Sequence, residues 1–147
     1  MTTTVRNIMT KKLETIEDSA SVQDAAKKMK EKGVSSLVVV DAGGIPQGFI
    51  TERDLVTKVC TNDTYTSTVT NKQIMSVPLI TIDSRSSPST ASDRMLQYNV
   101  RHLLVINTED NDKPIGIITP LDFARYEEFP NDEVGKDEIE KMLEYFI

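Results

Sequence analysis

Apolar residues along the chain follow two spacings, which predict helices and buried strands. The helical i, i+3, i+4, i+7 spacing occurs at Val22, Ala25, Ala26 and Met29. Ser21 is a predicted N-cap before this helix, and Gly33 ends it where a left-handed residue is favoured. A second helix shows the same signals, with the cap Ser87, first-turn Pro88, terminal Asn99 and the apolar face Ala91, Met95 and Leu96.

Short apolar runs rich in β-branched residues follow each of these helices. The runs at 36–41 and 102–107 are too apolar for half-exposed strands, so they predict strands buried on both faces. A turn then leads to a second strand, which ends at Ile50-Thr51 in one case and at Ile118-Thr119 in the other. The remaining predicted elements are strands near 13–16 and 79–82 and short helices over 52–60 and 120–126.

These elements occur twice because the sequence contains an internal repeat. Met9 matches Met75 (75 − 9 = 66), whereas Asp54 matches Asp122 (122 − 54 = 68). The two extra residues fall in the turn-rich segment 107–114, which predicts a surface turn. Each copy reads β-α-β-β-α, and about 55 residues are too few to be stable alone.

The predicted fold class is therefore α/β (α+β), with two pseudo-symmetric repeats that share a core. The predicted domains are a first repeat at 1–60, a linker at 61–72, a second repeat at 73–126 and an acidic tail at 127–147. Ile139, Met142, Leu143 and Phe146 give this tail one apolar helix face. That face predicts docking either onto its own domain or across an interface with a second copy or another protein.

Composition narrows the class of protein. The longest apolar run, 37–40, is far too short to span a bilayer, and the first ten residues show no secretory signal. The single cysteine, Cys60, is typical of a cytoplasmic protein without disulfides.

The net charge of −6 comes entirely from the tail, which contains eight acidic and two basic residues (2 − 8 = −6). The rest of the chain is neutral. A neutral body argues against nucleic-acid binding. The sequence has one histidine and one cysteine, 42 positions apart (102 − 60), and no motif of a catalytic or metal-binding site. It therefore predicts that the protein is not an enzyme and requires no cofactor or metal.

The repeated order resembles tandem cystathionine-β-synthase (CBS) domains, the pair known as a Bateman module. The residues that carry it are NIMT and QIMS, Thr-Ile, an Ala-containing helix, a buried apolar run, and the octets GFITERDL and GIITPLDF. The resemblance covers roughly residues 5–126. It implies a cleft between the repeats that binds adenosine-containing ligands such as AMP, ADP, ATP or S-adenosylmethionine, and pairing of modules into a flat dimer.

The Thr-x-x-Asp part of each octet has a structural and a functional interpretation. Thr51 can cap a helix whose dipole Asp54 complements. The same helix start presents N–H groups to a phosphate, and a fixed carboxylate can accept from both hydroxyls of a ribose. Thr119 and Asp122 fill the same positions in the second copy. We interpret the motif as serving both purposes, which predicts two ligand sites.

The two predicted sites are not equivalent. Arg53 is a candidate phosphate partner in the first, although Glu52 next to it would repel phosphate. In the second, Pro120 removes one backbone donor and Leu121 replaces the arginine. The resemblance implies further lining residues near the adenine and phosphate, namely Arg101, His102 and the backbone near Leu13, Glu14, Leu79 and Ile80.

The function predicted from these observations is a stand-alone, non-catalytic sensor of an adenosine-containing ligand that signals to an unknown protein partner. The alternative is a structural dimerisation or scaffold module whose sites stay empty. For Arg101 and His102 an exposed charge and a structural histidine remain alternative interpretations, and nucleic-acid binding remains the least favoured function.

Overall fold

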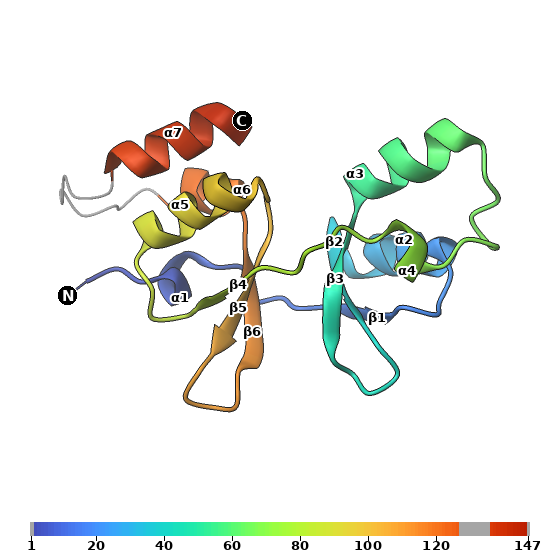
Figure 1. The fold of residues 1–147 in the computed structure, drawn as a ribbon, viewed down its shortest axis with the longest axis horizontal. Helices are drawn as coiled ribbons and strands as arrows, with labels where there is room; N and C mark the ends of the chain where they lie inside the picture. The colour runs from blue at the N-terminus through green and yellow to red at the C-terminus, as the bar shows by residue number, and fades with distance from the viewer. Residues whose placement is uncertain (1, 127–135, 147) are drawn as a thin grey trace. The chain divides into compact units, whose positions relative to one another are not determined.

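The computed structural model describes residues 2–126 and 136–146. The chain divides into two compact units, Leu13–Leu79 and Met1–Lys12 with Ile80–Ile147. Each unit has its own three-stranded sheet and its own apolar core, so the prediction of one core shared by both repeats was wrong. Figure 1 shows the same succession of strands and helices in both.

The sheet of the Leu13–Leu79 unit contains β1 (Thr15–Glu17), β2 (Ser36–Val40) and β3 (Pro46–Thr51), in that order. The helix α2 (Val22–Lys32) connects β1 to β2, which pair in parallel, and a tight turn joins β2 to the antiparallel β3. Three consecutive β2 residues, 37–39, are at most 1% exposed. This confirms a central strand that is buried on both faces.

The ends of α2 follow from local sequence. The Ser21 side chain accepts a hydrogen bond from the Asp24 N–H at 3.1 Å, and Gly33 closes the helix in the left-handed region at φ 65°. Val22 and Met29 face the core as predicted, but Ala26 is exposed. The buried stripe is thus narrower than the spacing predicted.

The segment after β3 is helical but irregular. It runs through α3 (Glu52–Asp54), the π-helix η1 (Leu55–Val59) and the 3₁₀-helix η2 (Cys60–Asn62). The predicted short helix over 52–60 is confirmed in position. The chain then reaches α4 (Asn71–Ile74), whose Asn71 is fully buried.

The second unit repeats this topology with the strands β4 (Thr81–Asp83), β5 (Leu103–Asn107) and β6 (Lys113–Ile118). The helix α5 (Pro88–Tyr98) connects β4 to β5, and α6 (Pro120–Arg125) follows β6. The two extra residues of this repeat lie in the exposed β5–β6 turn, where Asn111 and Asp112 have positive φ. The predicted place of the insertion is confirmed.

Two short helices belong to the unit that their place in the sequence would not suggest. The helix α1 (Val5–Ile8) comes before the strands of the first unit but belongs to the second unit, and α4 comes before the strands of the second unit but belongs to the first. The helix α1 packs into the core of the second unit, where the Val5 N–H donates to the Ser86 carbonyl at 2.8 Å. The residue Thr10 then bridges Ile117 of β6, just as Ser76 after α4 bridges Phe49 of β3. The compact units therefore change over at Leu13 and Ile80, which are 12 and 7 residues after the predicted starts of the repeats at 1 and 73 (13 − 1 = 12, 80 − 73 = 7).

The C-terminal helix α7 (Lys136–Phe146) docks onto its own unit. It packs against α5 and α6 (Figure 1), and its Met142 is fully buried. Ile139, Leu143 and Phe146 are partly buried against the same core. Of the two predicted ways of covering this apolar face, the structure contains the intramolecular one.

Candidate functional site: two buried aspartates at helix starts

The first aspartate, Asp54, lies where β3 passes into α3. Thr51 is the N-cap, and its hydroxyl oxygen accepts from the Asp54 N–H at 3.1 Å. In return the Asp54 Oδ2 accepts from the Thr51 N–H and the Thr51 hydroxyl, each at 3.0 Å. This reciprocal capping box fixes the carboxylate at the start of the helix.

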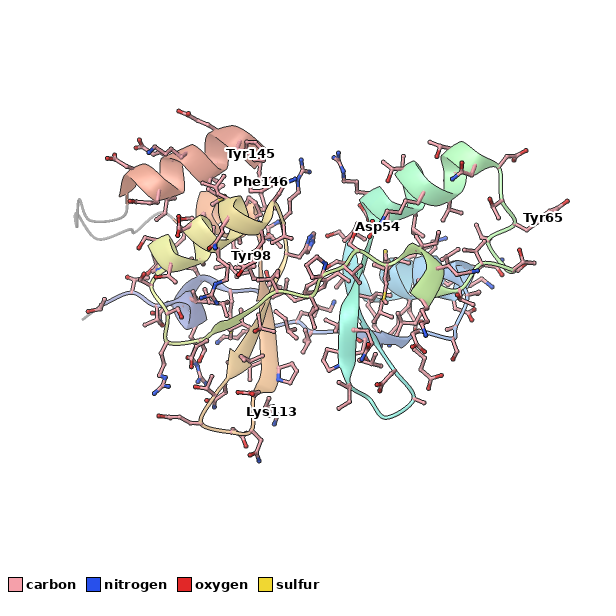
Figure 2. The ribbon with its side chains drawn as sticks, viewed as in Figure 1. Asp54, Tyr65, Tyr98, Lys113, Tyr145 and Phe146 are labelled. Atoms are coloured by element: carbon pink, nitrogen blue, oxygen red, sulfur yellow. The ribbon has the colours of Figure 1, made fainter. Side chains whose placement is uncertain are left out.

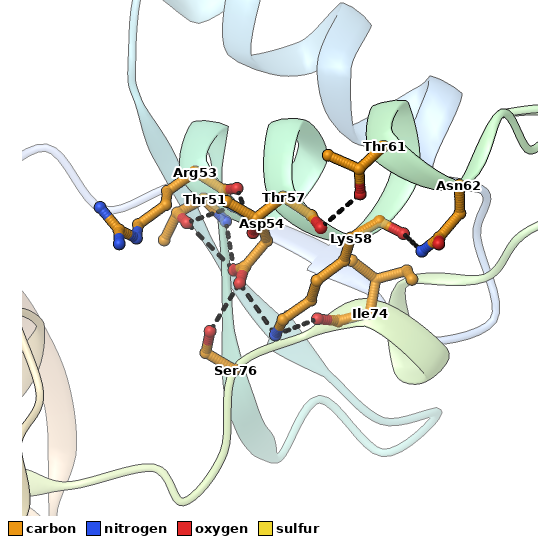
Figure 3. A network of polar contacts seen from close by, with 9 residues as sticks. All are labelled: Thr51, Arg53, Asp54, Thr57, Lys58, Thr61, Asn62, Ile74 and Ser76. Carbon is orange, nitrogen blue, oxygen red and sulfur yellow. Dashed lines mark hydrogen bonds and ion pairs between the residues drawn. The ribbon is translucent and has the colours of Figure 1, made fainter.

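The other carboxylate oxygen of Asp54 contacts two groups from outside the cap. Its Oδ1 accepts from the Ser76 hydroxyl at 2.7 Å and pairs with the Lys58 Nζ at 3.0 Å. The same Nζ also donates to the Ile74 carbonyl at 3.0 Å. Figure 3 shows Lys58 and Ser76 converging on one side of Asp54, which is only 4% exposed. Asp54 thus connects its own helix to the segment that follows α4.

The second aspartate, Asp122, repeats this arrangement at the start of α6. Its Oδ2 accepts from the Thr119 N–H at 2.9 Å and from the Thr119 hydroxyl at 3.5 Å. Its Oδ1 accepts from the Thr10 hydroxyl at 2.7 Å, the counterpart of the Ser76 bond. Asp122 is 6% exposed, and the position equivalent to Lys58 is Tyr126 (58 + 68 = 126).

Burial sets the protonation behaviour of Asp122. Loss of hydration raises the pKa of this carboxyl above its ordinary value, while the bonds from Thr10 and Thr119 and the charge of Arg125 lower it in part. A raised carboxyl pKa means that the folded state holds its proton more tightly than the unfolded state. Asp122 therefore lowers stability as the pH rises past its ordinary pKa, and the full cost is present above its folded pKa.

Replacing Thr10 by valine should raise the pKa of Asp122 further, because the carboxylate loses a hydroxyl donor that favours its charged form. Carbon-detected NMR titration of the side-chain carboxyl measures this pKa directly. The matched control is Thr108→Val, since Thr108 bonds Asp83 and not Asp122. A Thr10→Val protein with an unchanged Asp122 titration would contradict the contact.

The predicted cationic residues lie outside these networks. Arg53 is exposed, and its side chain extends away from the Asp54 carboxylate (Figure 3). Arg101 is also exposed, and its guanidinium carbon is 5.6 Å from the centre of the Phe146 ring, which is labelled in Figure 2. Arg101 thus contacts the C-terminal helix through a cation–π interaction. His102 is partly buried and directly precedes β5.

The predicted backbone positions take part in the sheets. The Glu14 carbonyl accepts from the Val38 N–H, and the Ile80 carbonyl accepts from the Leu104 N–H, each at 2.9 Å. Leu13 and Leu79 precede them and are half-buried. In the first turn of α3, the Glu52 N–H donates to the Ser35 carbonyl at 3.0 Å, while Pro120 has no N–H to offer. Several of the groups predicted to face a ligand therefore already have protein partners.

The sequence interpretation missed Thr10, Ser76 and Lys58, which contact the aspartates. The repeat offset pairs Thr10 with Ser76 (76 − 10 = 66), and each follows an Ile-Met pair. That signal identifies two equivalent hydroxyls but not their target. Lys58 lies at i+4 from Asp54, a spacing at which helical ion pairs form.

Comparison with known proteins identifies the class. The CBS domain family matches residues 5–60 and 72–128, which together are more than half of the chain, so the chain belongs to the CBS domain family and contains two copies of the domain. Of the predicted residues, those of the Thr-x-x-Asp pairs lie together within each unit, as described above.

Among individual relatives, an uncharacterised protein of Methanopyrus kandleri, MK0525, is 37% identical over 106 residues, 72% of this chain. The chain spans about half of that relative, 53% of its length. The CBS domain pair of protein MJ0100, solved with 5′-methylthioadenosine and S-adenosyl-L-methionine, is 27% identical, with a TM-score of 0.70 over 84% of this chain and 98% of that one. A hexameric CBS-CP12 protein from bloom-forming cyanobacteria is 29% identical, with a TM-score of 0.79 over 96% of this chain and 83% of that one.

Residues 2–126 and 136–146 contain no group of three or more His, Cys, Asp or Glu side chains arranged to hold a metal ion. Within the same residues, no helix is long and apolar enough to cross a membrane.

Proposed function

We propose that this chain is a non-catalytic regulatory module that binds an adenosine-containing ligand beside Asp54 and Asp122. The observation that carries the proposal is the buried carboxylate at a helix start, present once in each unit with a hydroxyl donor against its Oδ1. Because that oxygen already accepts from a protein hydroxyl, it has the chemistry to accept from a ribose hydroxyl. The two ligands in the solved structure of the MJ0100 domain pair, both adenosyl compounds, support this ligand class.

The surrounding groups fit the remaining parts of such a ligand. The exposed Arg53 guanidinium offers donors to a phosphate or carboxylate. Signalling then follows from differential affinity, since a ligand shifts the module only if it binds one arrangement more tightly than another. The downstream protein partner, a homodimer and a cytoplasmic location remain predictions from the sequence.

The competing function is a scaffold in which both aspartates serve only the fold. The capping boxes and the bonds to Ser76 and Thr10 favour it, because every one of these contacts stabilises the unit without a ligand. The two functions differ in whether an added ligand stabilises the folded chain.

A ligand panel separates the two functions. AMP, ADP, ATP or S-adenosylmethionine at about 100 times its dissociation constant should stabilise the fold by about 2.7 kcal/mol, because it binds only the folded state. Thermal unfolding with and without each compound measures this. The combined variant Asp54→Ala with Asp122→Ala should lose the response, whereas Asp110→Ala, an exposed aspartate of the β5–β6 turn, should keep it. Unchanged melting with every compound would favour the scaffold.

A further inference from the structure

The two aspartates differ in how many donors their oxygens already hold. A carboxylate offers about four acceptor positions, roughly two on each oxygen. Asp54 contacts four donors, the Thr51 N–H, the Thr51 hydroxyl, the Ser76 hydroxyl and the Lys58 ammonium. Asp122 contacts three donors among the described residues, the Thr119 N–H, the Thr119 hydroxyl and the Thr10 hydroxyl, and the second of these is long at 3.5 Å.

The difference lies on the oxygen available to a ligand. In both units Oδ2 is committed to the cap, so a ribose hydroxyl would have to approach Oδ1. Oδ1 of Asp54 holds two donors, and one of them is a cation at 3.0 Å. Oδ1 of Asp122 holds the Thr10 hydroxyl alone among the described residues, so about one acceptor position remains on it.

We propose that Lys58 and Ser76 occupy the acceptor positions of Asp54 Oδ1 that a ribose hydroxyl would need. An adenosine-containing ligand therefore binds beside Asp122 before it binds beside Asp54. This inference rests on the proposed function and adds an order of occupancy to it. Lys58 and Ser76 affect ligand binding indirectly, because they compete with the ligand for the Oδ1 atom of Asp54.

The Asp54 carboxylate can still accept a ligand if one of its two Oδ1 donors leaves. The Lys58 side chain is 43% exposed, so it can leave Asp54 for water or for a phosphate group of the ligand. Ser76 comes from the segment after α4 that bridges β3, which ties it more firmly. A ligand hydroxyl must displace at least one of these two donors at Asp54, whereas at Asp122 it can bind while the Thr10 bond stays. Hydrogen bonds to a charged group are the stronger kind, so losing one such contact should weaken binding beside Asp54 at least about tenfold relative to Asp122.

The test is a count of binding sites. Isothermal titration with AMP and with S-adenosylmethionine should give one tight site per chain in the wild type, lost in Asp122→Asn. The combined variant Lys58→Met with Ser76→Ala should gain a second site at least about tenfold tighter than any weak second site of the wild type. Adding Asp54→Asn to that variant should remove the gained site. Lys72→Met, at an exposed lysine of α4, is the matched control and should give no gain.

The outcomes separate the two proposals. Two equal sites in the wild type, a tight site that survives Asp122→Asn, or no gain in the combined variant would overturn the order of occupancy and leave the proposed function standing. Should Asp122→Asn fail to fold, as judged by thermal unfolding, the gain in the combined variant decides alone. No binding of either probe to any of these proteins would overturn both proposals.

Discussion

Replacing Met142 by alanine should lower the free energy of unfolding by about 2–5 kcal/mol, the usual cost of truncating a large buried side chain. Met142 is fully buried although it belongs to a helix at the end of the described chain. Its removal would leave a cavity where α7 packs against α5 and α6. Urea unfolding followed by far-ultraviolet circular dichroism measures the change.

The same helix provides the control for this substitution. Glu144 is exposed, so Glu144→Ala should change the free energy of unfolding by less than about 0.5 kcal/mol. If Met142→Ala changed the free energy of unfolding as little as Glu144→Ala does, α7 would not pack against its own unit in solution. The apolar face of α7 would then have to be covered elsewhere, and size-exclusion chromatography would show whether a second copy covers it.

The parts of the fold that sequence could predict are those with local causes. The bounds of α2 and α5 follow from a serine cap at the start and a left-handed residue, Gly33 or Asn99, at the end. The buried strands follow from uninterrupted apolar runs, and the repeat offset locates the inserted turn. The capping boxes of Thr51 and Thr119 were likewise predictable, because each is complete within four residues.

The parts that could not be predicted depend on contacts between distant residues. Ser76 reaches Asp54 across 22 positions, and Thr10 reaches Asp122 across 112. The helices α1 and α4 carry short-range signals, such as the Thr70 and Gln73 capping box, but those signals do not show which repeat each helix packs against. The partner of Oδ1, on which the order of ligand binding depends, follows only from that tertiary packing.

Substitution of the glycine in each octet should be nearly as damaging as loss of Met142. A Cβ on Gly48 would lie 2.6 Å from the Ser76 carbonyl oxygen, and one on Gly116 would lie 2.7 Å from the Thr10 carbonyl oxygen. Neither backbone oxygen can move without breaking the bridge that its residue makes to β3 or β6. Gly48→Ala and Gly116→Ala should each cost about 1–3 kcal/mol of unfolding free energy, the range for overpacking.

Gly43 supplies the matched control, because a Cβ there would meet only the Asp41 side chain, at an ordinary 3.4 Å. Gly43→Ala should therefore change the free energy of unfolding by less than about 0.5 kcal/mol. The substitutions at Gly48 and Gly116 also push on the residues whose hydroxyls bond Asp54 and Asp122. If all three alanine variants unfolded at the same urea concentration as the wild type, the segments after α1 and α4 would not lie against the sheets as described. That result would also contradict the contacts of Ser76 with Asp54 and of Thr10 with Asp122, because both depend on this placement.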